Sequence, residues 1–275
     1  MHGGCVTSQS RHDIICRGHQ DICCLTVEGP VEHLAPAVAA FFDLDKTVIS
    51  KSSTLAFGRP FYRYGLISRA DALRSVACQL VFRLAGANHG QMERIKEWVS
   101  GLCRGWPVDR VTAIVARYLD ELIVPYVYAE ARALIAAHQE AGQDVIIVST
   151  SGHEVVDPIA ERLGADSVIA TRLQVAGGHY TGVMEFYAYG EAKATRVREL
   201  AAERGYRLQD CYAYSDSVTD LPLLQTVGHP YAVNPDRSLR RIATERGWPI
   251  LEFASHAPGQ RPRRGESPVK GHAVR

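Results

Sequence analysis

The spacing of apolar and polar residues predicts alternating helices and strands from about residue 128 onward. Short, wholly apolar runs such as Val145–Val148 predict strands buried on both faces, and longer stretches with apolar residues every three or four positions predict helices. This alternation is typical of a parallel, doubly wound α/β sheet. We expect strands at 38–42, 144–148, 167–170, 211–214 and 231–233, a hairpin formed by 173–175 and 179–186, and helices at 129–141, 153–163, 191–204, 221–227 and 238–246.

Residues 51–125 have a different pattern. Apolar residues recur there at helical spacing, with breaks at Gly86 and Gly101, and almost no stretch reads as a strand. Two of the expected helices begin at Ser68 and Val108. We therefore predict a small helical subdomain inserted after the first strand of the sheet.

The two ends of the chain lack the pattern of a packed domain. Four of the seven cysteines lie in residues 1–36, but an odd count without a secretion signal does not indicate a disulfide framework, and their spacing does not match a zinc site. The tail at 256–275 is rich in proline, glycine and arginine. We expect a disordered N-terminal extension and a disordered basic tail, with the folded chain at 37–255.

The composition limits the kind of protein. At 275 residues the chain can bury a full core, and its 46% hydrophobic and 22% charged residues are ordinary for a soluble globular protein. A net charge of +1 provides no field that would recruit nucleic acid or an anionic membrane. No apolar run approaches the roughly 18 residues that span a bilayer, and charges interrupt the N-terminal stretch. We expect a cytoplasmic protein without a transmembrane segment.

The first predicted strand ends at a pair of acids, Asp43 and Asp45. Alternate side chains of an extended chain share a face, so both carboxylates leave the strand on the same side. Two close carboxylates repel unless a cation or hydrogen-bond donors stand between them, and carboxylates suit hard cations such as Mg²⁺. The alternative for this stretch alone is an Asp-rich turn or helix cap after a buried strand.

Other predicted strands and one helix add residues of the same chemistry. Ser149 ends the second strand, Asp216 and Asp220 follow a later one, and Lys193 lies early in the helix between them. In an open parallel sheet the carboxyl ends of the strands gather at the ligand site. Each residue alone has a structural explanation; Lys193 by itself would be a solvent-facing helix residue. Together they predict a site for a phosphate and a divalent cation.

In this order the residues resemble the four motifs of haloacid dehalogenase superfamily phosphatases. Residues 43–47, Asp-Leu-Asp-Lys-Thr, match motif I, and Ser149 at the end of its apolar run matches motif II. Lys193 matches motif III, and residues 216–220 match motif IV. The resemblance implies a Rossmann-like α/β core, and the helical insertion resembles the C1 cap of subfamily IB, which includes phosphoserine phosphatases.

The resemblance also implies a role for each residue. Asp43 would be the nucleophile that forms an aspartyl-phosphate, and Asp45 would be the general acid and base. Mg²⁺ would be held by Asp43, the main-chain carbonyl of Asp45 and Asp216. The other implied roles are phosphate binding by Ser149, Lys193 and Thr150, bracing of the loop by Thr47, and support of the metal site by Asp220.

The substrate is less closely defined. Phosphoserine phosphatases usually have serine at the position of Lys46 and Gly-Gly at Thr150-Ser151, so phosphoserine is one candidate beside histidinol phosphate, a lipid phosphate or another small phosphomonoester. Substrate choice in this family lies largely in the cap. We expect Arg59 and Arg63, together with Lys46, to help select the substrate.

Two other classes of protein share parts of this pattern. Asp45-Lys46-Thr47 is similar to the phosphorylation motif of P-type cation pumps, but this chain has no membrane helices. The second rival is a regulatory or partner-binding module that kept the fold without catalysis. The intact acids of motifs I and IV argue against it, because a protein without that chemistry has no reason to hold repelling carboxylates together.

Overall fold

The computed structural model describes residues 37–68 and 97–254. The predicted N-terminal extension with its early cysteines, the body of the helix expected from Ser68, and the tail after residue 254 lie outside the described residues. No helix in the described ranges is long and apolar enough to cross a membrane.

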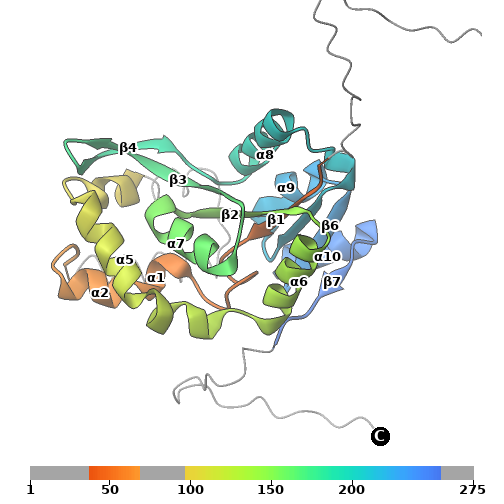
Figure 1. Ribbon diagram of the computed structural model, residues 1–275, viewed down its shortest axis with the longest axis horizontal. Helices are drawn as coiled ribbons and strands as arrows, with labels where there is room; N and C mark the ends of the chain where they lie inside the picture. Colours follow the sequence, from red (N-terminus) through yellow and green to blue (C-terminus); the bar gives the residue numbers. More distant parts are fainter. Residues whose placement is uncertain (1–36, 69–96, 255–275) are drawn as a thin grey trace, which may run out of the picture. The chain divides into compact units, whose positions relative to one another are not determined.

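A seven-stranded sheet runs through the described part of the chain in the order β4-β3-β2-β1-β5-β6-β7 (Figure 1). Every neighbouring pair is parallel except β3 and β4, which are antiparallel. The predicted doubly wound parallel sheet is therefore confirmed. Its strands are β1 (Ala39–Asp43), β2 (Asp144–Gly152), β3 (Ser167–Ala176), β4 (His179–Phe186), β5 (Tyr212–Ser215), β6 (His229–Val233) and β7 (Ile250–Leu251).

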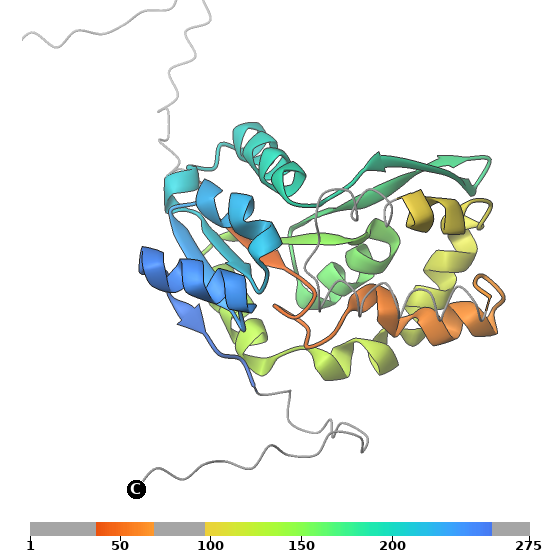
Figure 2. The same ribbon diagram turned by 180° about the vertical axis from the view of Figure 1, so that it is seen from behind.

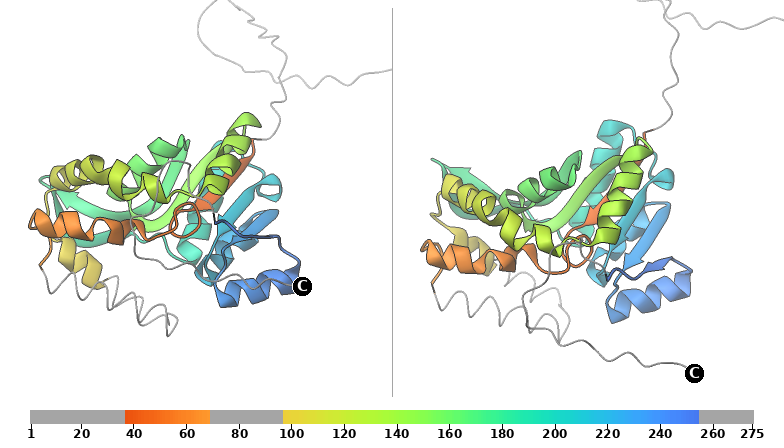
Figure 3. Two further views of the ribbon diagram at one scale, coloured as in Figure 1. Left: turned by 90° about the horizontal axis from the view of Figure 1, so that it is seen from below. Right: turned by 60° about the horizontal axis from the view of Figure 1, so that its bottom comes forward.

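Helices cover both faces of this sheet, as Figures 2 and 3 show. Because side chains alternate along a strand, Phe42 packs in one apolar cluster with Ile135 and Ile159, while Phe41 packs in another with Leu200 and Leu239. The helices are α1 (Ser53–Ala56), α2 (Gly58–Arg63), α5 (Val108–Leu122), α6 (Ala129–Glu140), α7 (His153–Leu163), α8 (Glu191–Arg204), α9 (Leu221–Thr226) and α10 (Arg237–Arg246), with 3₁₀ turns η1 (Val124–Tyr126), η2 (Leu208–Asp210) and η3 (Val218–Asp220).

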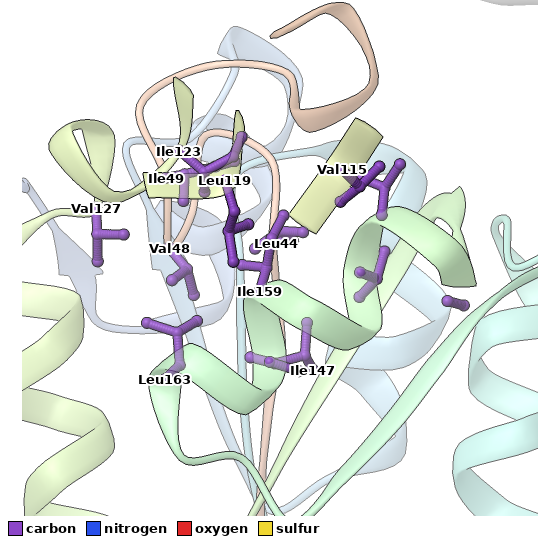
Figure 4. Packing of buried hydrophobic residues seen from close by; sticks show 14 of the residues in the cluster. Leu44, Val48, Ile49, Val115, Leu119, Ile123, Val127, Ile147, Ile159 and Leu163 are labelled. Atoms are coloured by element: carbon purple, nitrogen blue, oxygen red, sulfur yellow. The ribbon is translucent and has the colours of Figure 1, made fainter. Parts of the chain in front are cut away.

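The helical insertion shares the core of the sheet domain. The regular elements of 51–125 that the structure describes are α1, α2, a helical stretch at 97–103 and α5. Figure 4 shows Val115 and Leu119 of α5 in one apolar cluster with Leu44 of the loop after β1 and Ile159 of α7. This packing holds α5, the last helix of the insertion, against the loop after β1.

The strand predictions needed three corrections. β3 is one continuous strand through Ala176, whereas the sequence predicted a short strand followed by a separate hairpin. The prediction failed because β3 pairs with β4 alone beyond Thr171 and loses its apolar pattern there. β2 extends to Gly152 instead of ending at Val148. The two-residue β7 was missed, since so short an element carries no readable pattern.

Candidate active site

Strand pairing brings the predicted residues to one edge of the sheet. β1 lies between β2 and β5, so its carboxyl end has a neighbour on each side. Asp43 is paired in register with Val148, and Ser149 is the next residue of β2. Asp216 follows directly after β5. The carboxyl ends of three adjacent strands therefore supply one site, as the sequence predicted.

A fully buried lysine ties the acids together. Lys193, in the first turn of α8, is 1% exposed. Its Nζ donates to Asp43 Oδ1 at 2.7 Å and to Asp220 Oδ2 at 2.9 Å. Burial lowers the pKa of Lys193, but the carboxylates of Asp220 and Asp43 outweigh it and hold that pKa above its usual value. The lysine is thus a permanent positive charge inside the site, not a solvent-facing helix residue.

Asp220 serves to hold this lysine. It is 2% exposed, and the Ser215 hydroxyl donates to its Oδ2 at 2.8 Å. Asp220 Oδ2 therefore accepts two hydrogen bonds, one from Lys193 and one from Ser215. This geometry places Asp220 behind Lys193 in a supporting position. Ser215 was not among the predicted site residues, although it belongs to the polar strand end that signalled Asp216.

The loop after β1 is a tight turn that aims its side chains at the site. The main-chain N–H groups of Val48 and Ile49 both donate to the Leu44 carbonyl at 3.0 Å. Lys46 has a φ of 67°, a left-handed conformation that few non-glycine residues adopt. The Thr47 hydroxyl donates to Asp43 Oδ2 at 3.5 Å, the position expected of a residue that braces Asp43.

Asp45 is held by the start of the helical insertion. The Ser53 main-chain N–H at the start of α1 donates to Asp45 Oδ1 at 3.0 Å. Burial raises the pKa of Asp45, although hydrogen bonds from Ser53 act in the opposite direction. A carboxyl group that keeps its proton at higher pH than usual suits a general acid.

Burial disfavours the charged forms of Asp43 and Asp216 more than the nearby lysines favour them. Burial raises the pKa of Asp43 well above its usual value despite the nearby Lys193. Burial also raises the pKa of Asp216 to about 7, although the ammonium of Lys46, 3.8 Å from Asp216 Oδ2, lowers it. Two desolvated acids beside a single buried lysine form a site that a divalent cation would stabilise.

The donor set fits a magnesium ion. Asp43 and Asp216 offer carboxylate oxygens, and the Asp45 carbonyl could supply a third oxygen ligand. No group of three or more His, Cys, Asp or Glu side chains suited to a metal occurs in the described ranges. A site with two carboxylates and one carbonyl leaves ligand positions for water and phosphate, which is the habit of Mg²⁺ rather than of Zn²⁺.

At the end of β2, the Ser149 hydroxyl keeps its proton available for a ligand, whereas the Thr150 hydroxyl is bonded to the main chain. Ser149 is 2% exposed, and its Oγ accepts from the Ser151 N–H at 3.2 Å, which leaves its own proton for another acceptor. The Thr150 hydroxyl donates to the Ala188 carbonyl at 2.8 Å. Ser149 therefore has the geometry of a phosphate donor, whereas the side chain of Thr150 secures the neighbouring connection.

A hydroxyl cluster joins the end of β2 to the helical insertion. The Ser151 Oγ lies 2.8 Å from the Ser53 Oγ and 2.9 Å from the Thr54 Oγ1. Neither Ser53 nor Ser151 was among the predicted site residues. No local pattern could have revealed this cluster, because its two halves are almost a hundred residues apart in the chain.

The two arginines predicted on the cap are on the surface of the helical insertion. Arg59 and Arg63 are both exposed on α2. Within the part of the chain that the structure describes, no hydrogen bond or ion pair joins either guanidinium to the acids. Of the three predicted substrate-selecting cations, Lys46 is the one that the structure brings to the site.

Comparison with known proteins agrees with this architecture. The family model of haloacid dehalogenase-like hydrolases matches residues 40–225, and the chain belongs to that family. It is 58% identical, over 84% of its length and 83% of the relative's, to an "inhibition of morphological differentiation protein" of Streptomyces azureus. It is 55% identical to a probable phosphatase of Mycobacterium tuberculosis, over 78% of this chain and 75% of that one.

More distant relatives bear on the activity and the fold. A histidinol-phosphatase of Neisseria meningitidis is 33% identical over 78% of this chain and 98% of its own. A crystal structure of a Bordetella pertussis protein of unknown function has a TM-score of 0.69 at 30% identity, covering 78% of this chain and 98% of that one. A substrate-bound phosphoserine phosphatase structure, with a TM-score of 0.57 at 20% identity, covers 78% of this chain and 92% of its own and shares the fold.

Proposed function

We propose that this protein is a Mg²⁺-dependent phosphomonoester hydrolase that works through an aspartyl-phosphate on Asp43. The observation that carries the proposal is the buried Lys193, which pairs with Asp43 and Asp220 at the carboxyl ends of β1 and β5. Burying a lysine together with several acids costs desolvation free energy, and such clusters of charged groups are typical of functional sites that bind a charged ligand. A phosphoryl group with a divalent cation fits that arrangement.

Asp43 is the residue best placed to attack phosphorus. Lys193 holds its Oδ1 and Thr47 approaches its Oδ2, so the carboxylate is fixed before substrate arrives. Lys193 and the Ser149 hydroxyl would hold the phosphoryl oxygens. Mg²⁺, held by Asp43, Asp216 and the Asp45 carbonyl, would supply positive charge that offsets the repulsion between the phosphate and the nucleophile.

Asp45 is the proposed general acid and base. Its raised pKa keeps a proton available for the leaving alcohol, and the Ser53 N–H fixes the orientation of the carboxyl group. After the alcohol leaves, the same carboxylate would take a proton from the water that hydrolyses the aspartyl-phosphate. One residue thereby serves both halves of the reaction.

The proposed substrate is a small phosphorylated metabolite handled in the cytoplasm. The net charge of +1 provides no field for nucleic acid, and the relatives include a histidinol-phosphatase. Phosphoserine, histidinol phosphate and a lipid phosphate are the candidates. Direct contacts from Arg59 and Arg63 to the substrate stay a prediction.

Phosphate release from a panel of phosphomonoesters tests the proposal. We expect release that requires Mg²⁺ and that Asp43→Asn abolishes. Asp120→Asn is the matched control, because Asp120 is exposed on α5 and its partner among the described residues is the exposed Arg162. Full activity of the Asp43→Asn enzyme would refute the proposal, and a catalytically inert wild type with an intact fold would favour a regulatory module.

A further inference from the structure

A chain of three hydroxyl groups leads away from the proposed general acid and has no role yet in the proposed chemistry. The Ser53 Oγ lies 2.8 Å from the Ser151 Oγ, which lies 2.9 Å from the Thr54 Oγ1. Ser53 and Ser151 are both buried. The Ser53 main-chain N–H donates to Asp45 Oδ1 at 3.0 Å, and the Ser53 hydroxyl also hydrogen-bonds to the Asp45 carboxyl group. The hydroxyl chain therefore ends on Asp45.

An irregularity in β2 supplies the middle member of this chain. Ser149 pairs with Ala170 of β3, but Gly152 pairs with Thr171, the very next residue of β3. Two extra residues of β2, Ser151 among them, therefore oppose a single step of β3, and bulges of this kind redirect side chains next to active sites. The Ser151 main-chain N–H donates to Ser149 Oγ at 3.2 Å, while its hydroxyl contacts the start of α1. Main chain and side chain of Ser151 thus serve different neighbours.

The helix that carries Ser53 depends on other elements for its position. α1 has four residues, and its N-cap residue, Ser52, forms no side-chain capping bond. A single helical turn is unstable on its own, so contacts with other elements must fix it. The hydroxyls of its first two residues, Ser53 and Thr54, both meet the Ser151 hydroxyl. Ser151 therefore fastens α1 to the end of β2.

The direction of these hydrogen bonds follows from the charge of Asp45. An ionised carboxylate is the strongest acceptor in the group, so the Ser53 proton points to Asp45. Each hydroxyl has a single proton, so the Ser53 oxygen then accepts from Ser151, and the Ser151 oxygen accepts from Thr54. Consecutive hydrogen bonds polarise and strengthen one another. The chain therefore holds the Asp45 carboxyl group in one orientation.

We propose that Ser151 is a positioning residue for the general acid Asp45, acting through Ser53 with the support of Thr54. The inference rests on the proposed function and concerns the departure of the alcohol, not the binding of phosphate. Phosphoserine phosphatases usually have glycine at this position, so the hydroxyl is a feature of this chain rather than of that motif. An acid whose orientation is fixed in advance delivers its proton to the leaving oxygen more readily.

Two phosphomonoesters that differ in their need for an acid test this role. p-Nitrophenyl phosphate releases a stable phenolate, whereas 4-nitrobenzyl phosphate, larger by a methylene group, releases an alkoxide that must be protonated. We expect Ser151→Ala to lower kcat/KM for 4-nitrobenzyl phosphate by about 3- to 10-fold, the value of one net hydrogen bond, and to leave kcat/KM for p-nitrophenyl phosphate unchanged. Because kcat/KM covers only the steps up to departure of the alcohol, the later role of Asp45 as a base does not enter.

Further variants show whether the effect comes from the hydroxyl chain. Thr54→Val keeps the shape and should lower kcat/KM for 4-nitrobenzyl phosphate by only about twofold, because Ser151 still donates to Ser53. Ser167→Ala is the control and should match the wild type with both substrates, because Ser167 lies at the amino end of β3, away from the catalytic edge. Circular dichroism and thermal unfolding verify that each variant folds.

Inhibition by inorganic phosphate provides a second measurement. Ser151→Ala keeps the main-chain N–H that donates to Ser149, so the inhibition constant of phosphate should equal that of the wild type. A weaker inhibition together with equal losses of kcat/KM for both substrates would assign the Ser151 position to phosphate binding instead of to the general acid.

The outcomes separate this inference from the proposed function. Equal losses for both substrates in a folded Ser151→Ala enzyme, or no loss for either, would overturn the positioning role. The phosphatase would stand in both cases as long as release requires Asp43. Failure of the wild type to hydrolyse any phosphomonoester would remove the basis of both.

Discussion

At the scale of single residues, the charge balance around Lys193 decides the chemistry. Its Nζ stands between Asp43 and Asp220, two carboxylates far apart in the chain. An ion pair this deeply buried adds little net stability, because desolvation offsets the attraction, but removing one partner leaves an uncompensated charge. In the proposed reaction, Lys193 would therefore serve the phosphoryl group and the ionised state of Asp43 rather than the stability of the fold.

Replacing Lys193 should damage catalysis and make stability depend on pH. We expect Lys193→Met to lower kcat by about 10²-fold or more, as for the loss of one positioned charge. The carboxylate of Asp43, whose pKa burial already raises, would then lose its nearest counter-charge, so its folded-state pKa would lie further above that of the unfolded chain. Groups shifted upward stabilise the fold at low pH, and that stability is lost as the pH rises.

Thermal unfolding at pH 5 and pH 8 measures this effect. Lys193→Met should lose more stability relative to wild type at pH 8 than at pH 5. Arg198→Met, an exposed position on the same helix, should differ little from wild type at either pH. Equal losses for Lys193→Met at the two pH values would contradict the charge argument.

Asp216 gives a second prediction at this scale, for magnesium binding. Burial raises its pKa to about 7 in the metal-free protein, so a proton must leave before the carboxylate can bind the cation. We expect the Mg²⁺ affinity measured by calorimetry to rise by up to about tenfold per pH unit below 7 and to level off above it. Asp216→Asn should bind weakly with a flatter pH dependence. An affinity that is the same at pH 6 and pH 8 would refute this account.

At the scale of elements, burial decided which strands the sequence could predict. β1 and the apolar part of β2 are buried on both faces and appear as unbroken apolar runs. The outer half of β3 pairs with β4 alone and exposes most of its side chains, so its pattern indicated a break that does not exist. The acids at the strand ends were predictable because the strands themselves were.

The contacts that were not predictable cross between distant elements. Ser151 and Ser53 are 98 residues apart in sequence, and Tyr180 of β4 interacts with Glu154 of α7. Periodicity describes one element at a time and carries no information on which side chains of two elements meet. These contacts therefore emerged from the structure alone.

Gly228, just before β6, packs directly against the backbone of η2, and this contact predicts how the free energy of unfolding responds to an added methyl group. A Cβ on Gly228 would stand 1.8 Å from the Gln209 carbonyl oxygen, and the Gly228 N–H donates to Leu208 O at 2.9 Å. Gly228→Ala should therefore lower the free energy of unfolding by about 2–4 kcal/mol. Gly101→Ala, in a helical stretch with open space around it, should instead raise it by about 0.5–1 kcal/mol. Denaturant unfolding of both variants checks the pair, and similar stabilities would contradict the packing.

At the scale of the molecule, the strand order places the site. β1 lies at the centre of the sheet between β2 and β5: the chain passes from β1 to β2, β3 and β4 on one side and then returns to β5 on the other. In doubly wound sheets the crevice at such a switch point receives the ligand. The helical insertion starts from the loop after β1, so the element that holds Asp45 through Ser53 is tied to the catalytic edge.

The central claim is that Asp43 carries the phosphoryl group during turnover, and trapping this intermediate tests it most directly. Asp45→Asn is mixed with p-nitrophenyl phosphate, whose leaving group needs no acid, so the first step should proceed while the hydrolytic step lacks its base. We predict a burst of p-nitrophenol and, after acid quenching, a phosphoryl group on the peptide that contains Asp43, both absent from an Asp43→Asn, Asp45→Asn double variant. Burst-free kinetics together with an unmodified Asp43 peptide would contradict the mechanism.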